Sequence, residues 1–306
     1  MLRDEVLALL KAREGKPLSG EEMSRALGVS RAAVWKAMES LRDEGYVISS
    51  APRRGYALEG SPDRLSAGEL AGALAGRRVG RALVCLETVD STNNEVKRRA
   101  LAGAADGLAV VAERPRRPRC PLEEVSALTA WTAVAVCNAV ERVCGVRPGI
   151  KWPNDVILDG RKLCGILTEL ELEAETAALR HVVVGVGINL TQTAADFGPE
   201  VAPVAVSLAQ ALGRAPRRAE MAAAVLAALD ELYAAFPAER AAWLERYRAD
   251  CLTLGRTVRL LRAGEEEEAF AEAVDDAFAL VVRRADGSRE AVSSGEVSVR
   301  GLLGYV

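Results

Sequence analysis

The chain has 306 residues, of which 50% are hydrophobic and 27% are charged, and its formal net charge at pH 7 is -3. A chain of this length is too long for one small core, so we expect two or three domains. No global basic excess is present, which means that any contact with DNA must be local. The sequence has neither a long apolar run nor a signal-peptide pattern, and its six cysteines lack paired metal spacing. These features together predict a reducing, cytoplasmic location.

Residues 1–62 predict a winged helix-turn-helix DNA-binding domain, with the helix-turn-helix from Gly20 to Glu39. Ser19 and Glu22 fit a capping box, and Gly28 is the turn before a second capped helix. The candidate DNA contacts are Ser30, Arg31 and Lys36 on that helix, and Arg53 and Arg54 at the tip of the hairpin that forms the wing. Because residues 1–60 carry ten Lys/Arg against nine Asp/Glu, a packing module without DNA contact is the alternative.

A connector from Gly60 to about Gly80 leads to a second domain at 81–251, and the connector includes an expected helix at Ala67–Ala75. After a strand at Ala82–Glu87, the residues Ser91, Thr92 and Asn93 precede a helix that runs to about Leu101. Capping that helix needs only one of these side chains. The others predict a polar ligand site at the helix start.

The string Lys151-Trp152-Pro153-Asn154-Asp155 ends a strand, and Asp159-Gly160 then predicts a hairpin turn into residues 161–169. Pro153 and Asn154 interrupt the strand, so the polar side chains of this string are expected in an irregular, ligand-accessible position. A decorated turn without a ligand is the alternative interpretation.

The remaining elements cover this hairpin and close the chain. A long core helix is expected at Leu122–Val143, and a buried strand at Leu179–Leu190, where Gly185 and Gly187 allow close approach of a backbone or ligand. Helices follow at about Val204–Leu212 and Ala219–Asp250. Residues 252–306 show short strands typical of a small β-barrel, and the four glutamates at 265–268 are interpreted as a solvated turn. His181 is the only histidine, which argues against a histidine base.

The order of these predicted domains and motifs resembles that in the family of bifunctional biotin–protein ligases and biotin operon repressors. The resemblance rests on the segments GEEMSRALGVSRAAVWKAMESLRDEG, RRGYAL, VDSTNNEVK, KWPNDVILDGRKLCGILTELE, VVVGVGINL and SSGEVSVRG. It implies a multidomain α+β fold with an N-terminal winged helix-turn-helix. A central α/β ligase domain with a mixed sheet and an SH3-like β-barrel at 252–306 would follow. The ligase domain also resembles lipoate ligases, but the winged helix and the KWPND string favour biotin.

The resemblance implies that biotin and Mg-ATP form biotinyl-5'-AMP, and that biotin then passes to a lysine of a biotin carboxyl carrier protein of acetyl-CoA carboxylase. Lys151 matches the family lysine that contacts carboxylate and phosphate oxygens. Ser91, Thr92 and Asn93 match the segment that binds the ureido end of biotin, and Gly165, Ile166 and Leu167 match a strand that lines the pocket. Mg²⁺ would be held by the ATP phosphates. Operator DNA is the second expected partner, and the Gly185–Gly187 strand could pair across a homodimer.

One segment departs from the family. After Glu113 the family has a Gly-Arg-rich loop and a further strand, whereas this chain has Arg114-Pro115-Arg116-Arg117-Pro118-Arg119-Cys120-Pro121. Three explanations remain open: a true deletion that weakens or abolishes ligation, an error in the nucleotide sequence, or a substitute loop in which Arg116, Arg117 or Arg119 reaches the phosphates. A degenerate ligase that acts only as a DNA-binding repressor, with or without a response to biotin, is therefore the alternative function.

Overall fold

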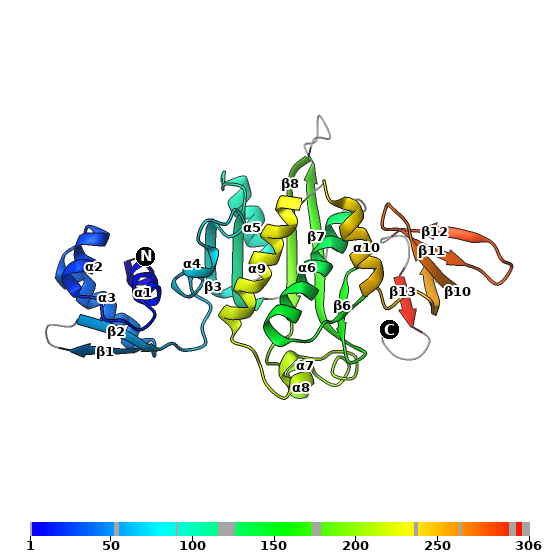
Figure 1. Cartoon of the computed structure of the whole chain (residues 1–306). Coiled ribbons are helices and arrows are strands. Elements are labelled where there is room, and N and C mark those ends of the chain that lie inside the picture. The colour runs from blue at the N-terminus through cyan, green and yellow to red at the C-terminus, as the bar shows by residue number, and fades with distance from the viewer. Residues whose placement is uncertain are drawn as a thin grey trace.

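The computed structural model describes residues 2–51, 55–89, 91–115, 126–172, 179–235, 238–262, 265–293 and 298–301. The molecule is elongated, with the N-terminal helices at one end, helix-covered sheets in the middle and the C-terminal strands at the other end (Figure 1). Within these described ranges, no helix combines the length and the apolar character that a membrane span requires.

The N-terminal unit is a winged helix, as predicted. It contains α1 (Leu2–Ala12), α2 (Gly20–Leu27), α3 (Arg31–Asp43), β1 (Val47–Ala51) and β2 (Gly55–Gly60). The capping box forms: the main-chain N–H of Glu22 donates to Ser19 Oγ at 3.1 Å, and the N–H of Ser19 donates to Glu22 Oε2 at 3.0 Å. Gly28 ends α2 with a φ of 65°, a left-handed conformation that glycine adopts without strain. The apolar residues of these elements form a core of their own.

The central unit contains two separate sheets. Its elements are α4 (Ala67–Leu74), β3 (Ala82–Val89), α5 (Thr92–Leu101), β4 (Leu108–Pro115), α6 (Ser126–Cys144), β5 (Gly149–Lys151), β6 (Asp155–Leu158), β7 (Arg161–Leu172), β8 (Leu179–Ile188), α7 (Ala194–Phe197), α8 (Leu208–Leu212), α9 (Arg218–Ala235) and α10 (Arg240–Asp250). Strands β3 and β4 form a parallel pair, while β5-β6-β7-β8 form an antiparallel sheet in chain order. Parallel and antiparallel pairing are both present, as predicted, but in two sheets among the described residues rather than in one mixed sheet.

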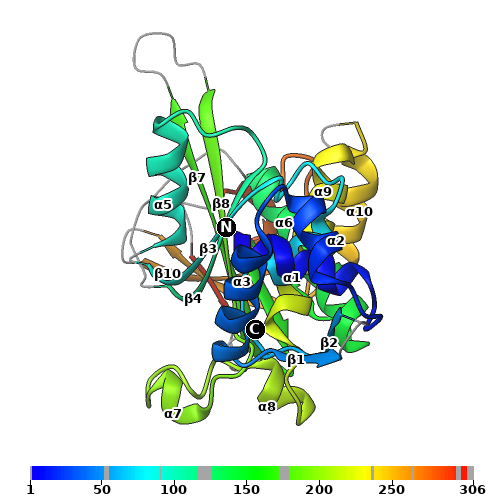
Figure 2. The same ribbon diagram turned by 90° about the vertical axis from the view of Figure 1, so that its left-hand side faces the viewer.

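Helices cover both faces of the β7–β8 ribbon, with α5 on one face and α6 on the other (Figure 2). The α6 side is the main apolar core, in which Trp131 of α6 stacks on Trp243 of α10 with ring centroids 5.3 Å apart. The single helix expected at Ala219–Asp250 is two helices, α9 and α10. Pro237 follows the end of α9, and proline cannot donate the hydrogen bond that would continue a helix.

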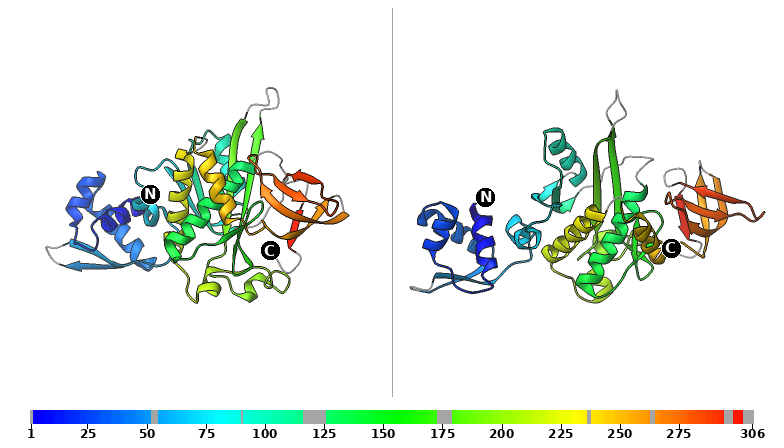
Figure 3. Two further views of the ribbon diagram at one scale, coloured as in Figure 1. Left: turned by 45° about the vertical axis from the view of Figure 1, so that its right-hand side comes forward. Right: turned by 45° about the horizontal axis from the view of Figure 1, so that its top comes forward.

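The C-terminal strands lie together at one end of the molecule (orange to red in Figure 3). They form a five-stranded antiparallel sheet in the order β12-β11-β10-β9-β13. Their bounds are β9 (Thr257–Arg262), β10 (Glu265–Val274), β11 (Leu280–Arg283), β12 (Arg289–Val292) and β13 (Ser298–Gly301). The described residues show no pairing between β12 and β13, so a closed barrel stays a prediction.

The interpretation of Glu265–Glu268 as a solvated turn is wrong. These four residues begin β10 and pair with β9, where Glu268 lies opposite Arg259. Arginines neutralise the charges of these glutamates. Arg284 Nε donates to Glu267 Oε1 at 2.6 Å, and Arg259 Nη1 lies 3.5 Å from Glu266 Oε2. Opposite charges on paired strands stabilise a sheet, and this cross-strand pairing is not visible in a run of identical residues.

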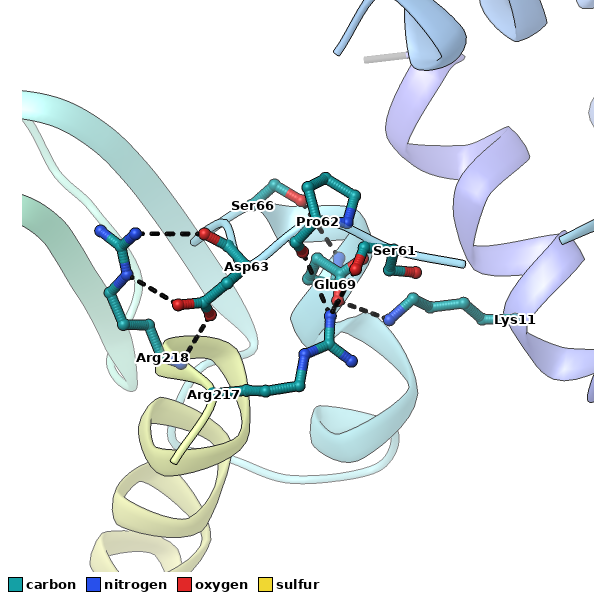
Figure 4. A network of polar contacts seen from close by, with 8 residues as sticks. All are labelled: Lys11, Ser61, Pro62, Asp63, Ser66, Glu69, Arg217 and Arg218. Carbon is teal, nitrogen blue, oxygen red and sulfur yellow. Dashed lines mark hydrogen bonds and ion pairs between the residues drawn. The ribbon is translucent and has the colours of Figure 1, made fainter. Parts of the chain in front are cut away.

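A polar contact region, here called the N-terminal joint, fastens the winged helix to the central unit (Figure 4). It comprises Lys11, residues 61–63, Gly68–Glu69 and Arg217–Arg218. Lys11 Nζ of α1 lies 2.6 Å from Glu69 Oε2 of α4, and Arg217 Nη2 lies 3.7 Å from the same oxygen. The Glu69 side chain is only 1% exposed. A buried carboxylate therefore links the winged helix, the connector and the start of α9.

Direct packing supplements these charges at the N-terminal joint. A Cβ added at Gly68 would lie 2.7 Å from Leu7 Cδ2, so α1 and α4 are in close contact at this point. Arg218 donates its main-chain N–H to Asp63 Oδ1 at 2.8 Å, and Arg217 Nη2 donates to the carbonyl of Pro62 at 3.1 Å. The connector is thus bonded at Pro62 and Asp63 to the start of α9, rather than being a loose tether.

The C-terminal joint, defined by Trp152, Pro153, Tyr247, Thr253 and Phe278, is mostly apolar. Trp152 is 2% exposed, and its indole Nε1 donates to the Phe278 carbonyl at 3.0 Å. Its main-chain N–H donates to Thr253 Oγ1 at 2.9 Å, and the Tyr247 hydroxyl donates to the Pro153 carbonyl at 3.0 Å. The core residues of the C-terminal sheet belong to the same apolar cluster as α6, so these two units share one core.

Candidate functional site

The candidate DNA-binding helix, α3, presents one exposed face. Ser30 caps this helix by accepting the main-chain N–H of Ala33 at 3.2 Å, and Val34, Met38 and Leu41 are buried as predicted. Arg31 and Lys36 are exposed, and Arg31 forms an ion pair with Glu21 of α2. Arg53 and Arg54 lie outside the described residues.

Sequence reasoning missed one residue on the same face. Trp35 is 54% exposed, although tryptophan is highly buried on average. Its position four residues after Arg31 places both side chains on one side of α3. The signal was present in the sequence, because the inward stripe of α3 leaves position 35 pointing outward.

The second candidate site lies on a row of residues that oppose one another on neighbouring strands of the antiparallel sheet. Lys151 of β5 lies opposite Asp155 of β6, Asp155 lies opposite Gly165 of β7, and Gly165 lies opposite Gly187 of β8. Residues that oppose each other in antiparallel strands project to the same face. Lys151, only 8% exposed, therefore shares its face of the sheet with two glycines that leave the backbone uncovered.

One residue that sequence reasoning did not select, Lys162, completes this row beside Asp155 of the predicted string. Lys162 Nζ forms an ion pair with Asp155 Oδ1 at 2.5 Å. A Cβ at Gly165 would come within 3.2 Å of the same Nζ, so glycine makes room for this lysine. The row thus holds two lysines and one carboxylate. Lys162 could have been recognised only from the β6–β7 register, which a bulge after Val156 shifts.

The start of α5 packs on the same face of the sheet, two residues along β8 from Gly187. Ser91 is the N-cap, and the main-chain N–H of Asn94 donates to its Oγ at 3.4 Å. Asn93 is 5% exposed and donates Nδ2–H to Glu169 Oε2 at 2.6 Å. Thr92 is partly exposed between them. The structure thus brings Ser91, Thr92 and Asn93 to the face that carries Lys151.

The three predicted residues of β7 divide between the two faces of the sheet. Gly165 and Leu167 share the α5 face, because alternate residues of a strand point the same way. Ile166 points to the other face, where it is buried in the α6 core, and the neighbouring Thr168 accepts a hydrogen bond from Thr129 of α6 at 2.8 Å. A ligand on the α5 face can therefore meet only the backbone of Ile166, whose carbonyl already accepts Asn154 Nδ2–H at 2.6 Å.

The KWPND string has a divided role. Lys151 and Asp155 belong to the row on the α5 face, whereas Trp152 and Pro153 are the attachment point of the C-terminal joint. Asn154 closes the turn by its bond to Ile166. The tryptophan therefore positions the lysine next to it rather than facing the candidate site.

The described thiols are poor nucleophiles. Burial raises the pKa of Cys164 to about 12, and it raises the pKa of Cys137 still further. Cys85 is partly buried, and its pKa is raised to about 11 by the same cause. Thiolates, which are the reactive form, are thus scarce at neutral pH. Among the residues that the structure describes, no group of three or more His, Cys, Asp and Glu side chains could hold a metal ion.

This arrangement suits binding of an anion beside a polar ligand head. Lysine cations lie in one row and an amide with hydroxyls lies at the neighbouring helix start, but the row contains no activated nucleophile. Such a site can neutralise carboxylate and phosphate oxygens while the reacting groups come from the substrates. Arg116, Arg117 and Arg119, which would reach the phosphates only under the substitute-loop explanation, lie outside the described residues.

Three family models match successive parts of the chain. Residues 3–57 match an HTH domain, residues 89–189 match the biotin/lipoate A/B protein ligase family, and residues 253–300 match the biotin protein ligase C terminal domain. The bifunctional ligase/repressor BirA of Bacillus subtilis (strain 168) is 34% identical over 256 residues, covering 76% of this chain and 78% of that protein.

Two further similarities extend the comparison. BirA of Escherichia coli (strain K12) is 28% identical over 321 residues, covering 97% of this chain and 96% of that protein. The 321 aligned positions outnumber the 306 residues of this chain, so that relative has residues which this chain lacks. The structure of a biotin protein ligase from Aquifex aeolicus in complex with biotin and ATP matches with a TM-score of 0.61 and 24% identity. It covers 72% of this chain and 99% of that one, and shows a common fold.

Proposed function

Because the chain belongs to the biotin/lipoate A/B protein ligase family, we propose that it joins biotin to a lysine of a carrier protein and also binds operator DNA as a repressor. The carrier is a biotin carboxyl carrier protein of acetyl-CoA carboxylase, and the operator controls biotin genes. The observation that carries the ligase half is the shared face of Lys151 and Asn93. A cation for oxygen anions and an amide for a polar head lie there together.

The proposed reaction has two steps. A carboxylate oxygen of biotin attacks the α-phosphorus of ATP, forming the mixed anhydride and releasing pyrophosphate. The amine of the carrier lysine then attacks the acyl carbon, an amide forms, AMP leaves and the amine loses a proton. Lys151 neutralises the reacting carboxylate and phosphate oxygens. Mg²⁺ enters bound to the ATP phosphates.

The polar head of biotin is a cyclic urea, with two N–H donors and one carbonyl acceptor. Ser91, Thr92 and Asn93 supply hydroxyl and amide groups that complement it. Gly165 and Leu167 lie under the ligand on the α5 face, and Ile166 contributes through its main chain. Arg116, Arg117 and Arg119 remain candidates for contacts with the phosphates.

A second candidate function is repression without ligation. It is favoured by the lack of any pairing, among the described residues, between β3–β4 and the four-stranded sheet. A missing strand between β4 and α6 would remove part of a pocket wall and the loop that covers the adenylate. DNA binding by the intact winged helix would then be the activity that remains.

The proposal includes a cytoplasmic location and three domains, at 1–62, 81–251 and 252–306, the last closing as an SH3-like barrel. It also includes a homodimer. Strand β8 is the edge of the described four-stranded sheet, and an edge strand offers main-chain groups that pair across a twofold axis. Sedimentation with and without biotin and ATP tests the dimer, and a monomer at all concentrations under both conditions would contradict it.

Transfer of labelled biotin to a purified carrier domain in the presence of Mg-ATP tests the ligase. We expect transfer by the unchanged chain and a loss of roughly 10²-fold in Lys151→Ala, because one charge at the reacting oxygens is removed. Lys16→Ala, which removes an exposed lysine of the winged helix, is the control and should keep full activity. No transfer by the unchanged chain would favour the second candidate function.

DNA binding is tested with duplexes selected from a random library. Arg31→Ala should weaken binding and lower the slope of log K against log salt by about 1, because one phosphate contact is lost. Arg98→Ala removes an equal charge from α5 of the central unit and should leave the slope unchanged. Equal slopes for Arg31→Ala and the unchanged chain would show that this arginine of α3 does not contact DNA.

A further inference from the structure

Glu169 is a buried carboxylate that the proposed mechanism does not use. It lies on β7, two residues beyond Leu167 and on the same face, and it is 4% exposed. Its Oε2 accepts Nδ2–H of Asn93 at 2.6 Å, and its Oε1 accepts Lys97 Nζ at 2.7 Å. Both donors come from α5, so Glu169 is the point at which the sheet holds the start of that helix.

The chemistry of Glu169 determines which end of the Asn93 amide faces it. An ionised carboxylate only accepts hydrogen bonds, whereas an amide has a donor end and an acceptor end. Lys97 forms an ion pair with the other carboxylate oxygen of Glu169. The nitrogen of Asn93 must therefore point to Glu169, and its oxygen must point elsewhere.

Gly185 of β8 supplies the second constraint. A Cβ at this position would lie 2.3 Å from Asn93 Oδ1 and 3.0 Å from Cγ, which is closer than nonbonded atoms approach. The amide thus lies directly on the glycine backbone. Leu167 is the partner of Gly185 in the sheet, so Oδ1 sits over the face that also carries Gly165 and Lys151.

We propose that Glu169 and Gly185 are positioning residues for Asn93. Glu169 holds the amide nitrogen, Gly185 leaves the space in which the amide lies flat, and Oδ1 is thereby fixed as an acceptor for an N–H of the cyclic urea of biotin. The inference rests on the proposed function, since it assigns the ligand of Asn93. Lys97 holds α5 but does not orient the amide.

The test is biotin binding and transfer kinetics with the full chain, a carrier domain and Mg-ATP. In Glu169→Ala the amide loses its fixed orientation, so we expect KM for biotin to rise by about tenfold while kcat and KM for ATP change by less than about threefold. Glu169→Gln keeps an acceptor for Asn93, and Lys97→Met keeps Glu169 itself. Both should therefore stay within about threefold of the unchanged chain in all three constants.

Gly185→Ala is an independent variant in case Glu169→Ala does not fold, which thermal unfolding will reveal. It should raise KM for biotin by displacing the amide. In an Asn93→Ala background, neither Glu169→Ala nor Gly185→Ala should raise that KM further, because both act through Asn93.

Additive effects in that background would overturn the inference, and so would a Lys97→Met chain as impaired as Glu169→Ala. The latter result would mean that docking of α5, not orientation of the amide, is what matters. Failure of the unchanged chain to bind biotin is a different outcome, and it would overturn the proposed function together with this inference.

Discussion

The two ends of the molecule are attached to its centre by different physical means. At the N-terminal joint, Lys11 of α1 and Arg217 before α9 both contact the carboxylate of Glu69 in α4, and the winged helix keeps a core of its own. At the C-terminal joint, Trp152 and Phe278 belong to a core that runs without a break from α6 into the C-terminal sheet. The winged helix is therefore an attached unit, whereas the C-terminal sheet is part of the body that holds Lys151.

The difference matters because ion pairs and apolar contacts respond to different conditions. Attraction between partly exposed charges weakens as salt rises, while apolar burial does not. A DNA-binding unit with a core of its own can lose such contacts without disturbing the core beside Lys151. A sheet that buries Trp152 cannot move without disturbing the lysine next to it.

The largest expected effect comes from Trp152→Ala at the C-terminal joint. Removing a buried indole should cost about 3–5 kcal/mol in the free energy of unfolding. Scanning calorimetry should show a lower transition temperature for the shared core and an unchanged transition for the winged helix. Ligation should fall as well, because Lys151 precedes Trp152.

Trp35→Ala is the matched control for that change. This tryptophan is exposed on α3, so its removal should alter stability by no more than about 0.5 kcal/mol. If Trp152→Ala moved the transition of the winged helix as much as that of the shared core, the distinction between the two joints would be lost.

A smaller effect is expected from Gly68→Ala at the N-terminal joint. The new methyl group would meet Leu7 Cδ2 at 2.7 Å and push α1 away from α4. We expect this to weaken the free energy of packing between the two helices by about 1–3 kcal/mol. Limited proteolysis should cut the connector faster, while biotin transfer should be unchanged.

Gly72→Ala in the same helix separates packing from helix propensity. A Cβ there has no neighbour within 4 Å, so alanine should stabilise α4 by about 0.5–1 kcal/mol and slow cleavage. Equal cleavage of the two variants would mean that Leu7 does not constrain Gly68.

The smallest effect concerns alkaline pH. Tyr46 lies beside Glu69 and Ser66, and burial, with a further contribution from the charge of Glu69, raises its pKa to about 12. An unfolded tyrosine has a pKa of about 10, so the folded chain retains the proton at higher pH. The associated stability is complete below about pH 10 and is lost as the pH rises through about 12. Tyr46→Phe should therefore lose stability less steeply over this range in denaturant titrations, and identical slopes would contradict the assignment.

Local signals explain what could be predicted. The caps of α2, α3 and α5 were placed correctly because a cap joins residues three apart in the chain. The hairpin at Lys151 followed from its turn residues. The family resemblance supplied the candidate ligand residues, and their placement on one face is a finding of the structure.

Other features could not be predicted because they join distant segments. Trp152 bonds to Phe278 across 126 positions, and Asn93 bonds to Glu169 across 76. The ion pair of Lys162 with Asp155 depends on a bulge that shifts the strand register. The glutamate run at 265–268 was interpreted as a turn because its arginine partners lie on other strands.

By itself, the sequence determined most of the elements, the winged helix and the family, because capping, turn chemistry and apolar periodicity act within a few residues. Only the tertiary structure decided which face of the sheet each residue occupies and how the two terminal units are attached to the central unit. It placed Ile166 in the core and Leu167 on the ligand face, turned Trp152 into an attachment point, and set Glu169 against the amide of Asn93. These outcomes depend on which strands pair and which helix covers each face, and burial then decides which polar groups must find partners.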